Sequence, residues 1–259
     1  YFSNETADTD EWLNLFDYLG TVDNYRDLVT LGWNGNPVHQ NLFNFLKRNS
    51  QLTTLMMSCC FSEECPESIN DFCQFISTST SFTTLIIAGN EINHFGKFTN
   101  NVIRSLSNHQ SLKELDISFN YGGDETTGLL LTFIQNSQQL EMIDFDAVCC
   151  QRTDSIVNLM KNLRMRKDQI HISFPTVEFT RLKNEKLISK EVFDEITHMF
   201  KVSIDPKVDN PASYQDGLQI NVKDNANSNE AATKKKGKNE DEEDDDLPYV
   251  PPSQILTKN

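Results

Sequence analysis

This chain of 259 residues has few basic residues for its size. It contains 23 Lys and Arg residues against 38 Asp and Glu residues, which gives a net charge of −15. Residues 1–202 carry 26 acidic and 16 basic residues, so the acidity is not confined to the C-terminal part. A surface of this charge excludes general binding to the phosphate backbone of nucleic acids and favours a basic partner.

The sequence also lacks the common signatures of catalytic, metal and membrane-spanning segments. None of the six cysteines lies in a CxxC pair, and none of the five histidines has a spacing typical of zinc sites. No Gly-rich phosphate loop, no nucleophile motif and no apolar run of membrane-spanning length occurs. We therefore expect no enzymatic activity, no cofactor, no metal and no membrane span. We expect the cysteines to be buried thiols, which favours a reducing, cytoplasmic compartment; they are Cys59, Cys60, Cys65, Cys73, Cys149 and Cys150.

A nine-residue pattern does recur along the chain. Its first, fourth and sixth positions are apolar, its ninth is Asn or Cys, and the five positions between them, called free below, take residues of any type. The clearest copy contains Leu112, Leu115, Ile117 and Asn120. The last positions of the six copies are Asn36, Cys60, Asn90, Asn120, Val148 and Pro175, separated by 24, 30, 30, 28 and 27 residues. A period of this size indicates a solenoid.

Each copy predicts a short strand whose three apolar residues point inward and whose free positions point outward. The amide at the end can satisfy backbone groups in the turn that leaves the strand. Stacked coils place these end residues in a row, which we call the structural ladder and expect at Asn36, Cys60, Asn90 and Asn120. We expect less regular turns at Val148 and Pro175. Between the strands, apolar residues recur at helical spacing; one such series is Ile69, Phe72, Cys73 and Ile76.

These repeats resemble leucine-rich repeats of the ribonuclease-inhibitor-like class, and the resemblance covers residues 1–175. It implies an α/β fold: a right-handed leucine-rich-repeat solenoid with a parallel concave sheet and convex helices, in about six coils with the first one truncated. Tyr1 and Asn4 match the last apolar position and the Asn of a strand, so we expect the chain to begin inside a longer solenoid. The alternative is an ordinary α/β domain with scattered amphipathic helices.

The C-terminal part predicts two further segments. Residues 176–202 are expected to cover the last coil, with a helix capped by Ser189. Residues 203–259 are polar and are expected to form a disordered, acidic, Pro-containing tail. In this tail, Lys234–Lys238 is either a nuclear-import signal or a solvated run, and Pro248–Pro252 could bind a groove-type domain as a polyproline segment.

The outward strand positions predict a binding face, because parallel strands of successive coils place them in columns. One column is Gly32, Met56, Ile86, Asp116, Asp144 and His171. Two carboxylates about 5 Å apart repel each other by about 0.8 kcal/mol even in water, so Asp116 and Asp144 favour a cationic partner. The predicted partner-binding residues are Met56, Thr84, Ile86, Glu114, Asp116, Glu141, Asp144, Asp146 and Asp168. The alternative is that a solvated face of an acidic protein simply tolerates these acids.

Three functions remain open from the sequence. The first is a non-catalytic scaffold that binds a protein partner on the concave face. The second follows from a resemblance to leucine-rich-repeat cytoskeletal regulators, which implies binding of actin capping protein through the tail. The third follows from a resemblance to the GTPase-activating protein of Ran, which implies GTPase activation, although no residue here matches that family's catalytic Arg.

Overall fold

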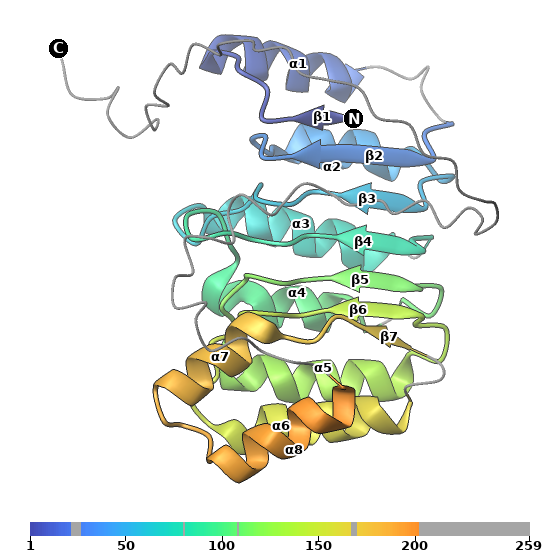
Figure 1. Cartoon of the computed structure of the whole chain (residues 1–259). Coiled ribbons are helices and arrows are strands. Elements are labelled where there is room, and N and C mark those ends of the chain that lie inside the picture. Colours follow the sequence, from blue (N-terminus) through green and yellow to red (C-terminus); the bar gives the residue numbers. More distant parts are fainter. Residues whose placement is uncertain (22–26, 80, 108, 167–169, 202–259) are drawn as a thin grey trace, which may run out of the picture. The chain divides into compact units, whose positions relative to one another are not determined.

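The computed structural model describes residues 1–21, 27–79, 81–107, 109–166 and 170–201. The chain divides into two compact units, and these residues all belong to the first unit, Tyr1–Ala212. In this part of the chain strands and helices alternate, and seven parallel strands form a single sheet in chain order (Figure 1). The strands are β1 (Phe2–Ser3), β2 (Thr30–Asn34), β3 (Thr54–Met56), β4 (Thr84–Ile86), β5 (Glu114–Asp116), β6 (Met142–Asp144) and β7 (His171–Ile172).

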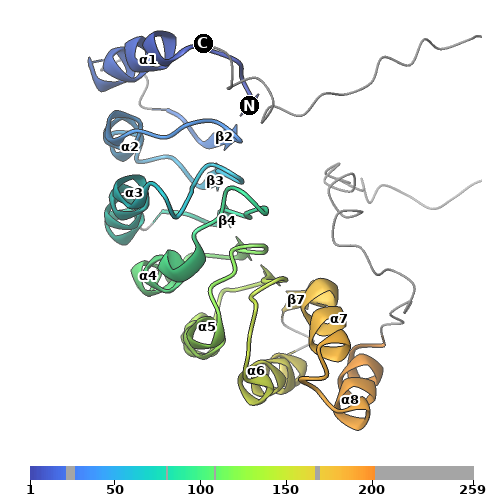
Figure 2. The same ribbon diagram turned by 90° about the vertical axis from the view of Figure 1, so that its left-hand side faces the viewer.

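The helices between successive strands lie on one side of this sheet, whereas the two helices after the last strand lie at its end (Figure 2). The helices are α1 (Thr9–Thr21), α2 (Gln40–Lys47), α3 (Pro66–Thr78), η1 (Gly96–Phe98), α4 (Thr99–Ser105), α5 (Asp124–Asn136), α6 (Thr153–Met165), α7 (Thr176–Asn184) and α8 (Lys190–Phe200). Consecutive helices from α1 to α6 pack against each other, and their row bends around the strands, which occupy the concave side. The structure confirms the predicted leucine-rich-repeat-like solenoid.

The core runs along the whole solenoid between the strands and the helices. The third inward position of each inner coil is at most 3% exposed and holds Trp33, Met57, Ile87, Ile117 and Phe145. The helical series contributes Ile69, Phe72 and Ile76, all fully buried. The inward apolar positions and the helical apolar stripes therefore meet in one continuous core.

The strand register confirms most of the predicted column. Met56 lies opposite Ile86, Ile86 opposite Asp116, and Asp116 opposite Asp144. The prediction for His171 is wrong, because this residue pairs with Met142 rather than Asp144. Ile143 pairs with Ile172, whereas the sequence pattern placed Ile170 opposite it. Because every second residue of a strand points inward, this two-residue shift leaves the apolar pattern intact.

The first strand also differs from the prediction, by one residue. Phe2, not Tyr1, lies opposite Trp33 and holds the last apolar position. Asn4 donates its backbone N–H to the Asn34 carbonyl at 2.9 Å. The backbone N–H of Glu5 in turn donates to Asn36 Oδ1 at 2.7 Å. Two adjacent aromatic residues made both alignments compatible with the sequence, and the backbone pairing distinguishes them.

Apart from Asn36, which accepts the Glu5 N–H, three ladder side chains make contacts that differ from one another. Asn120 Nδ2 donates to the carbonyls of Ile87 in the preceding coil (2.9 Å) and Ile117 (3.0 Å), and its Oδ1 accepts from the Phe95 N–H at 3.0 Å. Cys60 Sγ donates to the Trp33 carbonyl of the preceding coil at 2.8 Å. Asn90 Oδ1 instead accepts from Ile92 and Asn93 within its own loop. Asn120 therefore joins backbone groups of two coils, whereas Asn90 Oδ1 organises a local turn and the same side chain contacts the Cys59 thiol of the preceding coil.

The segment after β7 folds into α7 and α8, and α8 packs against α6. Ser189 caps α8 by accepting the Val192 N–H at 3.3 Å. None of the helices that the structure describes has the length and apolar content needed to cross a membrane. The predicted tail, 203–259, with Lys234–Lys238 and Pro248–Pro252, lies outside the described residues.

Candidate interaction face

The outward side chains of β2–β6, on the side opposite the helices, form a surface that we call the strand face. Its first half, which we call the apolar half, combines the half-buried side chains of Met56 and Ile86 with the outward Thr30, Thr54 and Thr84. The ring of Tyr1 extends this apolar half, because it lies against Gly32, where an added Cβ would stand 2.3 Å from the Tyr1 ring. Sequence reasoning missed Tyr1, since the one-residue shift had placed its side chain in the core.

The second half of the strand face is acidic, and its centre is the pair Asp116 and Asp144. The two residues are register partners on adjacent strands, which lie about 4.8 Å apart. Asp116 Oδ1 accepts hydrogen bonds from the N–H of Ser118 (2.9 Å) and from its hydroxyl (2.7 Å). Asp144 Oδ1 accepts from the Asp146 N–H at 3.2 Å. Among the described residues, no Lys or Arg forms an ion pair with either carboxylate.

The local environment disfavours the charged form of both groups. Burial, followed by the charge of Asp144, raises the pKa of Asp116 from 3.8 to about 6. Burial also raises the pKa of Asp144, against the opposing effect of its hydrogen bonds from Asp146 and Ser173. The fold thus holds two partly desolvated carboxylates side by side without a compensating cation, an arrangement that a bound cation would stabilise.

The remaining predicted residues surround this pair in different ways. Glu114 Oε2 accepts a hydrogen bond from the Thr84 hydroxyl at 3.2 Å, which links the two halves of the face. Glu141 forms an exposed ion pair with Lys113, with 2.6 Å between Nζ and Oε1. Asp168 lies outside the described residues. Glu141 is therefore neutralised within the chain, whereas Asp116 and Asp144 are not.

Asp146 has a structural role that the sequence did not indicate. Its Oδ1 accepts from the backbone N–H groups of Ala147 (2.7 Å) and Glu178 (2.9 Å), and its Oδ2 accepts from Val177 at 3.0 Å. Two of these donors lie in the first turn of α7, where N–H groups have no helical partner. Burial raises the pKa of Asp146 to about 6, although the hydrogen bonds from Glu178 and Val177 oppose the shift. Asp146 thus attaches α7 to the end of β6.

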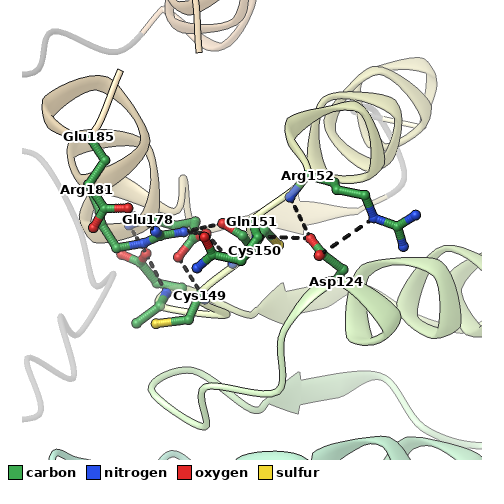
Figure 3. Close-up of polar contacts among 10 residues, drawn as sticks. Asp124, Cys149, Cys150, Gln151, Arg152, Glu178, Arg181 and Glu185 are labelled. Atoms are coloured by element: carbon green, nitrogen blue, oxygen red, sulfur yellow. Dashed lines mark hydrogen bonds and ion pairs between the residues drawn. The ribbon is translucent and has the colours of Figure 1, made fainter. Parts of the chain in front are cut away.

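A buried network beside this attachment was also missed by sequence reasoning (Figure 3). Glu178 is fully buried, and its two carboxylate oxygens accept from the N–H groups of Cys149 and Cys150, both at 2.8 Å. Arg181 donates to Glu178 Oε1 at 2.8 Å, to Glu185 at 2.6 Å and to the Cys150 carbonyl. One indication existed in the sequence, because the side chain of Val148 has no amide and the turn after β6 therefore needs an acceptor from another segment. The repeat pattern does not identify that segment.

The prediction of buried thiols is wrong for Cys65, which is exposed; Cys150 is buried, and the other four cysteines are partly buried. All six cysteines are free. Burial raises the pKa of Cys60 to about 12, and it also raises that of Cys149. These thiols remain protonated near neutral pH, and a protonated thiol is a poor nucleophile and a poor metal ligand.

The raised pKa of Asp116 predicts a pH-dependent gain in stability for Asp116→Asn. The folded state holds this proton more tightly than the unfolded state, so the contribution of Asp116 to stability is fully present below about pH 4 and is lost as the pH rises through about 6. The amide keeps an acceptor for Ser118 but carries no charge. We expect the variant to be more stable than the parent by about 1–2 kcal/mol at pH 7, and nearly equal to it at pH 3.5. Urea unfolding at both pH values measures the difference, and a difference independent of pH would contradict the expectation.

Comparisons with known proteins give little further information. No protein-family model matches the sequence, and no curated protein matches it. Among solved structures, a tropomodulin C-terminal domain from Caenorhabditis elegans is similar, with a TM-score of 0.39 and 12% sequence identity, over 60% of this chain and 96% of that chain. At this level the similarity carries no inference about what the present chain binds.

Proposed function

We propose that this chain is a non-catalytic protein-interaction scaffold that binds a cationic segment of a partner protein on the strand face. The observation that carries the proposal is the register pairing of Asp116 with Asp144, whose carboxylates have no cation among the described residues. Nothing in the solenoid core requires carboxylates at these outward positions, because the strands are held by their inward residues and backbone pairing. A Lys or Arg group placed between them would remove the repulsion and regain the lost solvation energy.

The apolar half of the strand face supports the same function. Met56 and Ile86 lie in the column that contains Asp116, so an apolar contact surface adjoins the acidic pair. Apolar side chains beside a charged anchor are typical of protein interfaces. The partner segment therefore carries a basic residue and an apolar residue roughly 5–10 Å apart, the distance spanned by one or two strands.

The repeat spacing and the environment of the thiols support two narrower statements. Register partners Thr30, Thr54, Thr84, Glu114, Met142 and His171 follow each other at intervals of 24, 30, 30, 28 and 29 residues. Such intervals, with a helix in most return segments, support the ribonuclease-inhibitor-like class of repeats. The six free thiols support a reducing, cytoplasmic location.

Binding of a fluorescent peptide of alternating Lys and Leu residues tests the proposed function. We expect saturable binding that weakens with salt, and at least a tenfold loss of affinity in the double variant Asp116→Asn/Asp144→Asn. The matched control is Glu64→Gln/Glu67→Gln, which removes two exposed carboxylates at and just before α3 and makes the same change in net charge. Equal losses in both double variants would show that only the overall charge attracts the peptide, and the proposed site would be rejected.

Two further assays separate this function from the alternatives. Acceleration of GTP hydrolysis by purified Ran would favour a GTPase-activating protein. Co-sedimentation with capped actin filaments that is lost on removal of residues 203–259 would favour a cytoskeletal regulator acting through its tail. A scaffold of the proposed kind gives neither result and retains peptide binding after removal of the tail.

A further inference from the structure

A buried histidine joins the segment that leads into β5 to the preceding part of the solenoid. His109 is 1% exposed, and its Nε2 lies 2.5 Å from the carbonyl oxygen of Ile76 in α3. Its ring also stacks on Phe82, which precedes β4, with 5.8 Å between ring centroids and 11° between the planes. We call the contact of His109 with Ile76 and Phe82 the entry junction.

The neutral imidazole of His109 has one nitrogen without a partner. A carbonyl can only accept a hydrogen bond, so Nε2 carries the proton and Nδ1 is an acceptor. Nδ1 is buried and has no hydrogen-bond partner within the described part of the chain. A second proton on the ring would bind at Nδ1 and place a cation with an unsatisfied donor against Phe82. Burial accordingly lowers the pKa of His109, against the smaller opposing effect of the Ile76 carbonyl.

The equivalent position two coils earlier holds an amide that is fully satisfied. Asn49 and His109 each lie three residues before the first apolar position of a repeat copy. Asn49 is also buried, but its Nδ2 donates to the Phe45 carbonyl at 2.9 Å and its Oδ1 accepts from the Leu28 N–H at 3.2 Å. An amide does not titrate, so acid leaves these contacts unchanged, whereas the contacts of His109 depend on its protonation state.

The segments around His109 offer no carboxylate that could stabilise its charged form. Residues 77–83, 105–112 and 134–140 contain no titratable group other than His109. The nearest titratable groups along α3, α4 and the approach to β5 are Cys73, Arg104 and Lys113. Burial raises the pKa of Cys73, which keeps this thiol neutral, and Arg104 and Lys113 each form an exposed ion pair. Protonation of His109 is therefore opposed by burial and compensated by no nearby anion.

We propose that the entry junction is a pH-sensitive switch, in which protonation of His109 releases the segment that leads into β5 from α3 and Phe82. The unfolded chain binds this proton near pH 6.5, whereas the folded chain binds it only at lower pH. The contribution of His109 to stability is therefore fully present above about pH 6.5 and is lost as the pH falls through the lower, folded-state value.

The switch lies where the two halves of the strand face meet. The N–H groups of Lys113 and Glu114 donate to the Thr83 carbonyl at 2.8 and 3.0 Å. Directly beyond them, Thr84 and Glu114 form the hydrogen bond that links the apolar half to the acidic half. Release of the junction therefore loosens the strand face at this boundary. The switch depends on the contacts of His109 and holds whether or not the strand face binds a cationic partner.

Hydrogen exchange of the Lys113 and Glu114 amides tests this inference. Between about pH 7.5 and about pH 5, we expect their protection factors, which correct for the intrinsic pH dependence of exchange, to fall by about tenfold or more. His109→Gln can keep a donor to the Ile76 carbonyl but cannot titrate, so this fall should be absent. The raised pKa values of Asp116 and Asp146 act in the opposite direction. They are common to both proteins, so the difference between the proteins isolates the imidazole.

Two controls and a direct titration complete the test. The amides of Thr53 and Thr54, which donate to Val29 at the junction that contains Asn49, should show no such fall. His198→Gln removes an exposed imidazole on α8 and should behave like the parent. NMR titration of the parent should give a pKa for His109 below 6.5, even if His109→Gln folds poorly.

Three outcomes would overturn the inference. The first is a measured pKa of His109 at or above 6.5. The second is an equal loss of protection in the parent and in His109→Gln. The third is a loss at Thr53 and Thr54 as large as that at Lys113 and Glu114, because acid would then act on the whole solenoid rather than on the entry junction.

Discussion

Replacement of Glu178 by Ala should destabilise the C-terminal end of the solenoid by about 3–5 kcal/mol. The variant loses the acceptor for the N–H groups of Cys149 and Cys150 and leaves Arg181, whose side chain is only 20% exposed, without its buried partner. Removing one member of a buried ion pair costs more than the pair contributes, because the remaining charge stays desolvated. Urea unfolding at pH 7 measures the global loss, and hydrogen exchange locates it at the turn after β6 and in α7.

The matched control for this prediction is Glu185→Gln. Glu185 also pairs with Arg181, at 2.6 Å, but its side chain is 48% exposed. An exposed pair contributes at most about 1 kcal/mol, so this variant should be nearly as stable as the parent. Comparable losses in the two variants would show that the Glu178 carboxylate is solvated, contrary to its contacts. Glu178→Gln, which keeps one acceptor oxygen but no charge, should fall between the two.

Asn120→Ala should cost about 2–4 kcal/mol, the second-largest expected effect. The side chain is buried and connects the Ile87 carbonyl of one coil with the Phe95 N–H in the loop that follows. Alanine leaves these backbone groups buried without partners, and an unsatisfied buried group costs about 1–3 kcal/mol. Chemical unfolding measures the loss in free energy, with hydrogen exchange of the Phe95 amide as the local readout.

Asn90→Ala provides the comparison. Asn90 holds the equivalent ladder position one coil earlier, but it is half-buried, and its Oδ1 accepts from Ile92 and Asn93 in its own loop. Its side chain also forms a hydrogen bond with the partly buried thiol of Cys59. Water can replace these contacts, so we expect a loss of about 1 kcal/mol or less. If the two variants lose the same free energy of unfolding, the hydrogen bonds of Asn120 between coils add no measurable stability. The ladder residues would then stabilise only their own turns.

The repeat pattern predicted the fold well because one physical requirement recurs in every coil. A short strand must bury alternate residues, and its return segment must bury one helical stripe. The register of inner strands followed from the same rule, as the column through Met56, Ile86, Asp116 and Asp144 shows. The rule failed at the two ends, where β1 and β7 each allowed a second alignment of similar apolar residues and only backbone pairing selects one.

The candidate site was predictable only in part. The outward positions of Asp116 and Asp144 follow from strand alternation, so their proximity could be read from spacing. The roles of Asp146 and Glu178 could not, because both depend on how α7 meets the end of β6. That contact joins residues about 30 positions apart outside the repeat pattern, and a pattern carries no information on a segment that does not repeat.

The sequence by itself determined the architecture: a solenoid of parallel strands with helical returns, and an outward column that changes from apolar to acidic. Periodicity suffices here because the burial of each coil depends mainly on its neighbours in the array. Only the tertiary structure shows which carboxylates hold segments of the chain together and which have no cationic partner among the described residues. That division depends on distances and burial between segments: Asp146 and Glu178 hold α7, Glu141 pairs with Lys113, and Asp116 faces Asp144.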